Sequence, residues 1–294
     1  VLLLKDLKQI TVIGLGLLGG SITMAVSRSF SALKTVGYAH RHSTAQKARR
    51  LNIASQVCEN IEESVSNADL VILATPISTF EKILKDIAPA LKKGCIVTDV
   101  GSTKTQPHRW AEKIIPPHIH YIGSHPIAGS EQRGVDFARD DLFEKAICIV
   151  TKTKKTNPKA ANVLKKFWTD IGCTVKELTP AEHDRIFAAV SHLPHITAAA
   201  LLNANSKKLL DYAGKGFIDT SRVASGPANI WADILLTNSL NCSKAIDRLI
   251  SELSRIKQAI DSKDKIQIEK LLKNAGKKRA EMINYKMKIE EVIS

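Results

Sequence analysis

Aromatic residues and acidic residues are both scarce in this 294-residue chain. Phe, Trp and Tyr make up 5% of it, and 29 Asp and Glu face 43 Lys and Arg, which leaves a net charge of +14. Such a charge makes nucleic acids and small anions candidate partners. A surface that stacks nucleic-acid bases needs aromatic side chains among its basic ones, and the sequence does not interleave them. We therefore expect solvated helix faces, a small anionic substrate and no nucleic-acid partner.

Long hydrophobic runs and paired cysteines are absent as well. No segment approaches the roughly 20 apolar residues that a membrane-spanning helix requires, and the apolar start Val1–Leu4 is too short for a secretory signal. The five cysteines are scattered, without a Cys-x-x-Cys pair or a cluster at metal-ligand spacing. These absences predict a cytoplasmic protein with reduced thiols, no membrane segment and no metal site.

The period of the hydrophobic pattern changes near residue 178. Before it, short β-rich apolar runs alternate with amphipathic stretches, which is typical of βαβ units and a mostly parallel sheet. After it the strand signals stop, and 179–182 carries the N-cap Thr, the Pro and the capping-box Glu of a helix that should run toward Lys208. We expect an α/β domain over residues 1–178 and an all-α domain over residues 179–294. The expected strands are Gln9–Gly14, Thr35–Ala39, Asp69–Thr75, Cys95–Val100, His120–Ser124, Ala146–Thr151 and Thr174–Leu178.

A glycine motif lies between the first expected strand and the first expected helix. Gly14 permits the tight turn, Gly16 lets the backbone approach a pyrophosphate, and Gly19 lets helix and strand pack closely. The helix N-terminus adds amide donors and a positive dipole end. The motif predicts a Rossmann-type dinucleotide site, and a glycine turn without a ligand is the alternative. The residues of this motif are Gly14, Leu15, Gly16, Leu17, Leu18 and Gly19.

The residues after the second expected strand indicate which dinucleotide is preferred. An NAD site carries an acidic residue about 20 positions beyond the last glycine, where it binds the ribose 2′-hydroxyl. Ala39 stands there. Arg41, with His40 and Ser43, offers charge-assisted hydrogen bonds to a 2′-phosphate instead. We therefore expect NADP, with NAD as the alternative if Arg41 is only a surface cation.

Two further segments each follow an expected strand, Asp99–Lys104 and Gly123–Glu131. Ligands of open α/β sheets gather beyond the carboxyl ends of the strands, so both segments should face the cofactor. His125 lies in the second segment, and a neutral imidazole there can accept a hydroxyl proton while a hydride leaves the same carbon. The pattern therefore favours a dehydrogenase.

Several segments match one family in order along the chain. They are Ala74–Pro76, Asp99–Lys104, His125–Glu131, Glu182–Asp184, Ser191–His195 and Arg222–Ser225, followed by Trp231. With the glycine motif they resemble the prephenate/arogenate dehydrogenase family of tyrosine biosynthesis, over Ile10 to about Ile256. The resemblance implies oxidative decarboxylation of prephenate to 4-hydroxyphenylpyruvate with NAD(P). Arogenate dehydrogenase, or a broad cyclohexadienyl dehydrogenase making tyrosine directly with NADP, is the alternative.

The resemblance also implies roles for individual residues. His125 is similar to the histidine that accepts the proton of the substrate 4-hydroxyl, and Ser102 to its hydrogen-bonding partner. Arg222 matches the arginine that holds the ring carboxylate. The other matching positions are His183 and His195 in the substrate pocket, Ser130 and Glu131 as a gating pair, and Thr75, Pro76 and Gly101 beside the cofactor. From the residues alone, the histidines of 183–195 fit a polar helix face as well, and Trp231 fits a core residue better than a pocket wall.

The resemblance extends to partners and regulation. It implies a homodimer built on the C-terminal helices, and any feedback by tyrosine would act at the active site because the sequence contains no segment for a regulatory domain or a fused chorismate mutase. Two competing hypotheses remain. A β-hydroxyacid dehydrogenase would need a catalytic lysine in the helical part, where no such motif stands out, and a nucleotide-sensing or nucleic-acid-binding protein would keep only the fold.

Overall fold

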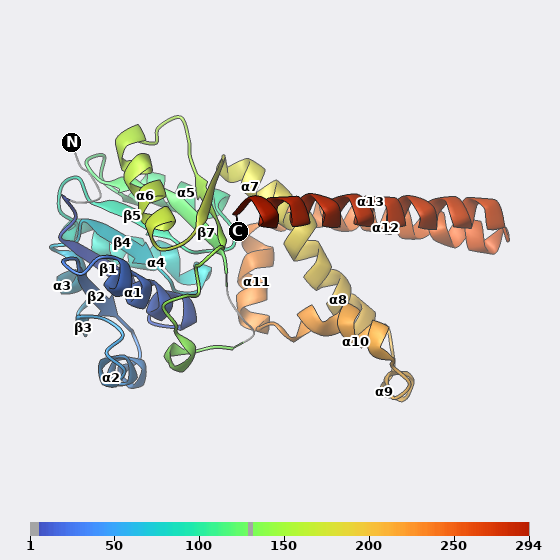
Figure 1. The fold of residues 1–294 in the computed structure, drawn as a ribbon, viewed down its shortest axis with the longest axis horizontal. Helices are drawn as coiled ribbons and strands as arrows, with labels where there is room; N and C mark the ends of the chain where they lie inside the picture. Colours follow the sequence, from blue (N-terminus) through green and yellow to red (C-terminus); the bar gives the residue numbers. More distant parts are fainter. Residues whose placement is uncertain (1–5, 129–131, 294) are drawn as a thin grey trace. The chain divides into compact units, whose positions relative to one another are not determined.

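The computed structural model describes residues 6–128 and 132–293 (Figure 1). Within them the chain forms two compact units, one ending at Ser239 and one starting at Leu240. Every strand in the described ranges belongs to the first unit, and helices follow it, so the expected class of an α/β part followed by an all-α part is confirmed. The domain boundary expected at residue 178 lies inside the first unit and stays a prediction.

The first unit contains a six-stranded sheet in the order β3-β2-β1-β4-β5-β6, in which every pairing is parallel. Its strands are β1 (Gln9–Ile13), β2 (Lys34–Tyr38), β3 (Gln56–Cys58), β4 (Leu70–Leu73), β5 (Ile96–Asp99) and β6 (His120–Tyr121). The order β3-β2-β1-β4-β5 places the start of the chain at the centre, with later strands added on either side, as in a Rossmann fold.

Helices cover both faces of this sheet. Successive side chains of a strand point to opposite faces, and accordingly Ile10 and Val12 of β1 join one hydrophobic cluster while Ile13 joins the other. The first cluster also takes residues from α1 (Leu17–Ser29), α2 (His42–Arg50) and α6 (Pro158–Asp170). The second takes residues from α3 (Ile61–Val65), α4 (Phe80–Ile87) and α5 (Thr105–Ile114). A parallel sheet buried on both faces explains why its strands read as continuous apolar runs.

A second, three-stranded sheet corrects one of the expected strands. Its strands are β7 (Gly123–Ile127), β8 (Ile147–Thr151) and β9 (Thr174–Leu178), with β7 antiparallel to β8 and β8 parallel to β9. The expected single strand His120–Ser124 is wrong, because the chain pairs with β5 up to Ile122 and with β8 from Gly123 onward. The residue pattern of a strand does not show where its pairing partner changes. This change of partner brings His125 to the edge of the parallel sheet.

The helical part of the first unit begins as expected and ends earlier. Thr179 and Glu182 form the capping box that starts α7 (Pro180–Phe187). A π-helical turn at Ala188–His192 joins α7 to α8 (Leu193–Asn203), so the expected long helix runs from Pro180 to Asn203 with this turn inside it and ends short of Lys208. Pro194 follows this turn; proline has no N–H for the helical ladder, and its ring crowds the preceding turn. The remaining helices of the unit are α9 (Lys207–Leu210), α10 (Lys215–Ser221) and α11 (Ala228–Thr237).

The segment Pro180–Asn203 is long and apolar enough to cross a membrane by length and composition, which the sequence reading did not anticipate. Its buried positions, however, include His183, Asp184, His192 and His195. Such polar groups are costly in lipid and here contact other parts of the chain. These buried polar contacts argue against a membrane span at Pro180–Asn203.

The second unit consists of two long helices, α12 (Ser239–Asp261) and α13 (Lys265–Ile293). Several large apolar side chains along them are exposed, among them Ile250, Leu253, Ile260, Ile266 and Leu272. Large apolar side chains left exposed along two long helices are typical of a surface that another chain covers.

Candidate active site

The glycine motif forms the turn between β1 and α1. Gly14 has a φ of 103°, a conformation that other residues rarely adopt, and a side chain at Gly19 would put its Cβ 1.9 Å from the Gly14 carbonyl oxygen. Gly16, by contrast, has no atom within 4 Å of the Cβ it lacks and lines an open pocket. The first amides of α1 have no partner within their own helix. The turn therefore leaves space and donors for a phosphate, as a dinucleotide requires.

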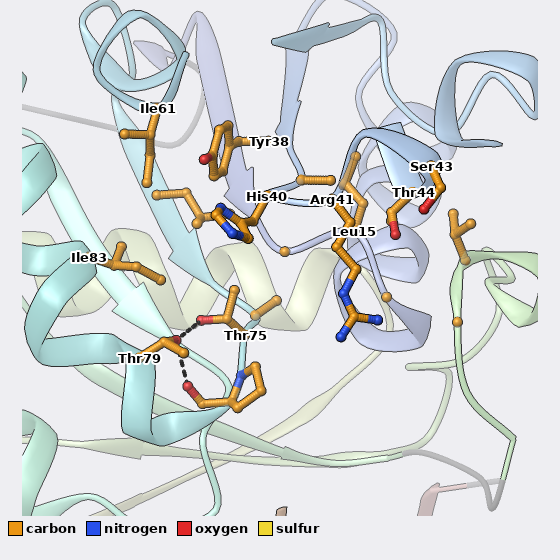
Figure 2. A pocket seen from close by; sticks show the side chains of 18 of the residues that line it. Leu15, Tyr38, His40, Arg41, Ser43, Thr44, Ile61, Thr75, Thr79 and Ile83 are labelled. Atoms are coloured by element: carbon orange, nitrogen blue, oxygen red, sulfur yellow. Dashed lines mark hydrogen bonds between the residues drawn. The ribbon is translucent and has the colours of Figure 1, made fainter. Parts of the chain in front are cut away.

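A pocket of about 760 Å³ opens over this turn (Figure 2). The predicted cofactor residues on its wall are Gly14, Leu15, Gly16, His40, Arg41, Ser43, Thr75 and Pro76. Leu17 and Leu18 instead pack against the hydrophobic core, and Gly19 lies against the turn. Gly101 does not line the pocket; its amide donates to Asp99 Oδ1 at 2.7 Å. Wall residues that the sequence reading missed include Tyr38, Thr44, Lys47, Thr79, Lys82, Asp86 and Asp136.

Arg41 stands where the chain enters α2. It precedes the first residue of the helix, and Figure 2 shows its side chain extended into the pocket, with Ser43 and Thr44 nearby. The pocket's two carboxylates are already paired, Asp86 with Lys82 and Asp136 with Lys47, both at 2.7 Å. Within residues 6–128 and 132–293, Arg41 has no ion-pair partner. This end of the pocket therefore has a cation available for an added negative charge.

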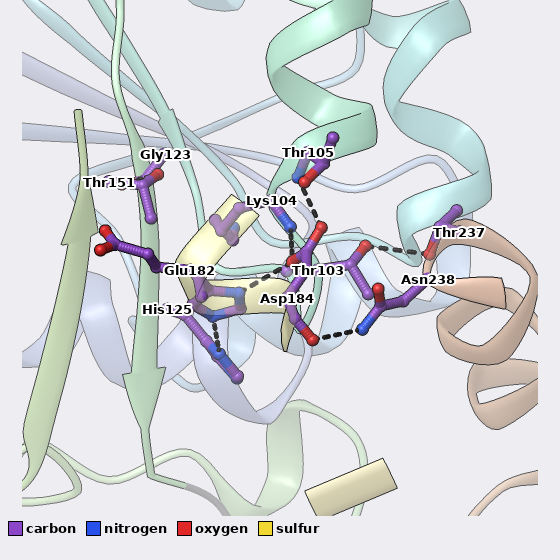
Figure 3. Close-up of polar contacts among 12 residues, drawn as sticks. Thr103, Lys104, Thr105, Gly123, His125, Thr151, Glu182, Asp184, Thr237 and Asn238 are labelled. Carbon is purple, nitrogen blue, oxygen red and sulfur yellow. Dashed lines mark hydrogen bonds and ion pairs between the residues drawn. The ribbon is translucent and has the colours of Figure 1, made fainter. Parts of the chain in front are cut away.

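His125 is the first member of a chain of three side chains. Its Nδ1 lies 2.8 Å from His183 Nε2, and His183 Nδ1 lies 2.9 Å from Asp184 Oδ1 (Figure 3). The ring of Phe187, one turn along α7, stacks on His183 with 4.4 Å between ring centroids and also contacts His125. His125 is partly exposed while His183 and Asp184 are buried, so the histidine chain has one open end.

Backbone amides hold the buried end of this chain. Lys104 N donates to Asp184 Oδ1 at 2.7 Å and Thr105 N to Asp184 Oδ2 at 2.8 Å, at the start of α5. Asn238 Nδ2 donates to the Asp184 carbonyl oxygen at 2.8 Å. Burial raises the pKa of the Asp184 carboxyl, but the hydrogen bonds from His183, Thr105 and Lys104 outweigh it and lower the pKa below its usual value. Asp184 is therefore ionised at neutral pH.

Burial, together with neighbouring positive charge, keeps both histidines neutral. The pKa of His125 is lowered well below 6.5, chiefly by burial and further by His183, Lys104 and His192. Burial is also the main cause that lowers the pKa of His183. Because each group's charged form is disfavoured, both rings are neutral imidazoles at pH 7.

The hydrogen-bond order then fixes where each proton lies. Ionised Asp184 can only accept, so His183 carries its proton on Nδ1. Neutral His183 consequently accepts at Nε2, and His125 donates to it from Nδ1. His125 is left with an unprotonated Nε2, the atom that a general base uses.

Helices α8 and α11 contribute an aromatic wall. His195 stacks on Trp231 with ring centroids 3.6 Å apart and planes 9° from parallel. His195 Nδ1 is buried and has no hydrogen-bond partner among the described residues. A side chain at Gly226 would put its Cβ 2.3 Å from Trp231 Nε1, so this glycine lets the stack form. Trp231 is therefore more than a core residue: it holds a histidine with a spare ring nitrogen.

The other predicted substrate residues have mixed outcomes. Ser102 precedes α5 and is partly buried; His183, and not Ser102, is the neighbour of His125 Nδ1. Arg222 lies in the 3-10 turn Arg222–Ser225 and is exposed. Ser130 and Glu131 lie outside the described residues. The predicted roles of these residues, and of His183 as a substrate contact, stay predictions.

Two residues of the site escaped the sequence reading. Asp184 had a signal, since it adjoins a histidine in the segment Glu182–Asp184 at the start of a helix. Asn238 had none, because it follows α11 and reaches the Asp184 carbonyl, 54 residues earlier, only in the folded chain.

The chain combines a parallel sheet and its glycine turn with a dinucleotide-sized pocket and a histidine base. Together these features define a nicotinamide-dependent dehydrogenase of the Rossmann type. Residues 22–177 match the family profile described as prephenate dehydrogenase, nucleotide-binding domain, and residues 179–274 match prephenate dehydrogenase, dimerization domain. The chain belongs to the prephenate dehydrogenase family and is an oxidoreductase.

Relatives and solved structures agree with this membership. The chain is 32% identical over 279 residues to prephenate dehydrogenase of Bacillus subtilis, covering 92% of this chain and 75% of the relative. It is 33% identical over 264 residues to cyclohexadienyl dehydrogenase of Zymomonas mobilis, covering 87% and 90%. The structure of A. aeolicus prephenate dehydrogenase with hydroxyphenyl propionate and NAD+ superposes with a TM-score of 0.88 at 33% identity, covering 94% and 98%. Synechocystis arogenate dehydrogenase gives 0.82 at 29% identity, covering 93% and 99%.

Proposed function

We propose that the chain oxidises and decarboxylates prephenate to 4-hydroxyphenylpyruvate with NADP as the preferred acceptor. The observation that carries this proposal is the hydrogen-bonded series His125, His183 and Asp184, which presents an unprotonated imidazole nitrogen at the carboxyl end of the strands. The pocket over the glycine turn fits a dinucleotide, because Gly16 faces open space where the backbone must approach a phosphate.

His125 acts on the substrate hydroxyl in this proposal. Its Nε2 accepts the proton of the 4-hydroxyl group as the hydride leaves ring carbon 4, and the bound nicotinamide supplies the hydride acceptor. The electron pair of the broken O–H bond forms the carbonyl at carbon 4. When the ring carboxylate leaves as carbon dioxide, the electron pair of the broken C–C bond enters the ring and makes it aromatic, and the carbonyl oxygen takes up a proton to become the phenol hydroxyl. The proton on His125 is stabilised through His183 by the ionised Asp184.

Cations and donors around the aromatic wall would hold the two carboxylates of prephenate. Arg222 is assigned to the ring carboxylate, because a planar guanidinium binds a carboxylate through two hydrogen bonds. His195 is assigned to the side chain, because its buried Nδ1 is without a partner in the described residues. Ser102 would hydrogen-bond near the 4-hydroxyl, since it lies on the loop before α5 close to His192.

Arogenate is the second candidate substrate. The matches to a cyclohexadienyl dehydrogenase and to an arogenate dehydrogenase favour a pocket tolerant of an amino group in place of the keto group. A two-by-two assay tests the proposal: prephenate or arogenate is mixed with NADP or NAD, and reduced nicotinamide is followed by absorbance. Highest kcat/KM with prephenate and NADP is expected. If the enzyme turned over arogenate alone, arogenate would be its substrate. If the folded protein turned over neither compound, both candidate substrates would be rejected.

Arg41 is expected to set the preference for NADP. Replacing it with alanine removes charge-assisted hydrogen bonds to the 2′-phosphate, which corresponds to about a 10- to 100-fold weaker Kd for NADP and little change for NAD. Fluorescence titration with both dinucleotides measures this. Lys82→Ala is the matched control, because Lys82 lines the same pocket but is paired with Asp86, so both dinucleotides should weaken alike. An equal loss for NADP and NAD in Arg41→Ala would exclude the 2′-phosphate role.

The assembly and the location of the chain are part of the same proposal. We propose a homodimer through α12 and α13, supported by the match to a dimerization domain and by the exposed apolar residues of these helices. A cytoplasmic location is supported by the five cysteines, which are all free thiols. Tyrosine, if it inhibits, would compete with prephenate at the aromatic wall.

A further inference from the structure

A buried ion pair lies directly behind the histidine chain. Lys104 and Asp99 are both fully buried, and Lys104 Nζ is paired with Asp99 Oδ1. Asp99 ends β5 and also accepts hydrogen bonds from Gly101 N and from Tyr121 Oη, both at 2.7 Å. All charges of the pair are therefore satisfied inside the protein.

Lys104 touches both ends of the histidine chain. Its Nζ donates to the carbonyl oxygen of Ser124 at 2.6 Å, and Ser124 is the residue before His125 on β7. Its backbone amide donates to Asp184 Oδ1 at 2.7 Å. The Ser124 side chain is itself fixed, by Trp168 Nε1 at 2.9 Å and Thr98 Oγ1 at 2.8 Å. One residue thus connects the strand that carries the base to the carboxylate that orients it.

Stability alone does not account for this arrangement. Burying two charges has a desolvation cost that their attraction roughly offsets, and well-packed apolar residues of the same volume are commonly as stable or more so. The Tyr121 hydroxyl and the Gly101 amide, held close to Asp99, add to the polar groups taken from water. A role in holding the reacting geometry explains why the pair lies here.

We propose that Lys104 is a positioning residue for the dehydrogenation, which holds His125 in place through Ser124 and Asp184 and uses its charge to keep the histidines neutral. This inference rests on the proposed function, in which His125 is the base. Lys104 is a fixed positive charge near both rings, and it lowers the pKa of His125 and of His183 after burial. The other groups facing His125 are His183 and Asp184 from α7, His192 from the π-helical turn and Cys148 of β8.

The test removes both charges of the pair at once. Lys104→Met alone leaves Asp99 buried without its partner and is expected to destabilise the fold, whereas the double variant Asp99→Asn/Lys104→Met keeps the shapes and removes the charges. We expect the double variant to melt cooperatively and to bind NADP as the wild type does. Its kcat should be about 100-fold lower, since small displacements of a catalytic group have effects of that size.

The pH profile separates positioning from simple support of the fold. Of the two charges that the double variant removes, Lys104 lowers the pKa of His125, while Asp99 raises the pKa of His183. Loss of the Lys104 charge therefore lets the His125 imidazolium form more readily, so the pKa of His125 rises and the acid limb of kcat/KM moves to higher pH. Lys104→Arg keeps the charge but changes the donor at Ser124, so it should lower kcat with the acid limb unmoved. Asp69→Asn/Lys92→Met is the matched control, because this pair, 2.6 Å apart, lies at the opposite end of β4. It should leave kcat and the acid limb unchanged.

The outcomes distinguish this inference from the function on which it rests. Wild-type kcat and an unmoved acid limb in the folded double variant would overturn the role of Lys104 and leave the proposed function standing. The role of Lys104 would also be overturned if Lys104→Arg kept the wild-type kcat and the double variant behaved like the wild type. Absence of turnover by the wild type with either substrate would overturn the proposed function itself.

Discussion

Replacing His125 with asparagine should lower kcat by about 10²- to 10⁴-fold, the contribution expected of a general base. Asparagine has no nitrogen that can take up a proton at neutral pH, so the substrate hydroxyl would have to lose its proton to water. His125 does not line the dinucleotide pocket, and the Kd for NADP should therefore stay near its wild-type value. Steady-state kinetics with prephenate, combined with NADP titration, measures both quantities.

The pH dependence of the wild type adds a second measurement on the same residue. Because the pKa of His125 is lowered well below 6.5 by burial and its neighbours, the base stays unprotonated as the pH falls through the usual histidine range. We expect kcat/KM to stay level from pH 7 to below 6.5 and to fall only at more acidic pH. In His125→Asn that acid limb should disappear.

His120→Asn is the matched control for the loss of a histidine. His120 lies on β6, one residue before the Tyr121 that contacts Asp99, and its side chain makes none of the hydrogen bonds of the histidine chain. It should keep wild-type kcat. A His125→Asn enzyme with kcat within a few-fold of the wild type would show that another group removes the proton.

Local sequence signals predicted the parts of the site that depend on a few neighbouring residues. The glycine turn needs Gly14 at positive φ and Gly19 without a side chain, and both requirements are visible in the spacing. The start of α7 was equally visible, since its capping box is made by Thr179 and Glu182. Such features were predictable because their partners lie within one turn of the chain.

Features that depend on distant partners were not predictable from the sequence. Asp184 receives its amides from Lys104 and Thr105, about 80 residues earlier, and only the fold brings the start of α5 to α7. His183 matched a family position assigned to the substrate pocket, yet it lies fully buried between His125 and Asp184. The strand breaks at Ile122 because the next residues pair with β8, which lies more than 20 residues further along the chain. The residue type at these positions shows which chemistry a side chain can do, but it does not show which residue the side chain contacts.

Asp184→Asn should be about as damaging as loss of the base, with kcat lowered by up to roughly 10⁴-fold, because it changes the tautomers and not the shape. Two backbone amides and His183 Nδ1 all donate to the carboxylate, whose two oxygens accept them. Asparagine offers one oxygen and one donor group. An NH₂ group in the place of Oδ1 would face both His183 Nδ1 and Lys104 N, and one in the place of Oδ2 would face Thr105 N.

If the NH₂ group faces His183, the proton order of the whole series reverses. His183 Nδ1 must then accept, its proton moves to Nε2, and His125 Nδ1 must accept from it. The proton of neutral His125 then lies on Nε2, the nitrogen that has to take the substrate proton. The base is present and in place but in its inactive tautomer.

Kinetics and NMR of the histidine rings together test this. Ring nitrogen shifts should report Nδ1–H for His125 in the wild type and Nε2–H in Asp184→Asn, with thermal melting used to confirm a folded variant. Asp170→Asn is the control, since Asp170 pairs with Lys166 on α6 and loses only a surface ion pair. A folded Asp184→Asn enzyme with wild-type kcat, or one that keeps the Nδ1–H form of His125 despite a slow rate, would contradict the assignment. A wild-type kcat would mean that Asp184 only holds α5 and α7 together. A slow rate with His125 still in its Nδ1–H form would mean that Asp184 acts through its charge and does not control the tautomer.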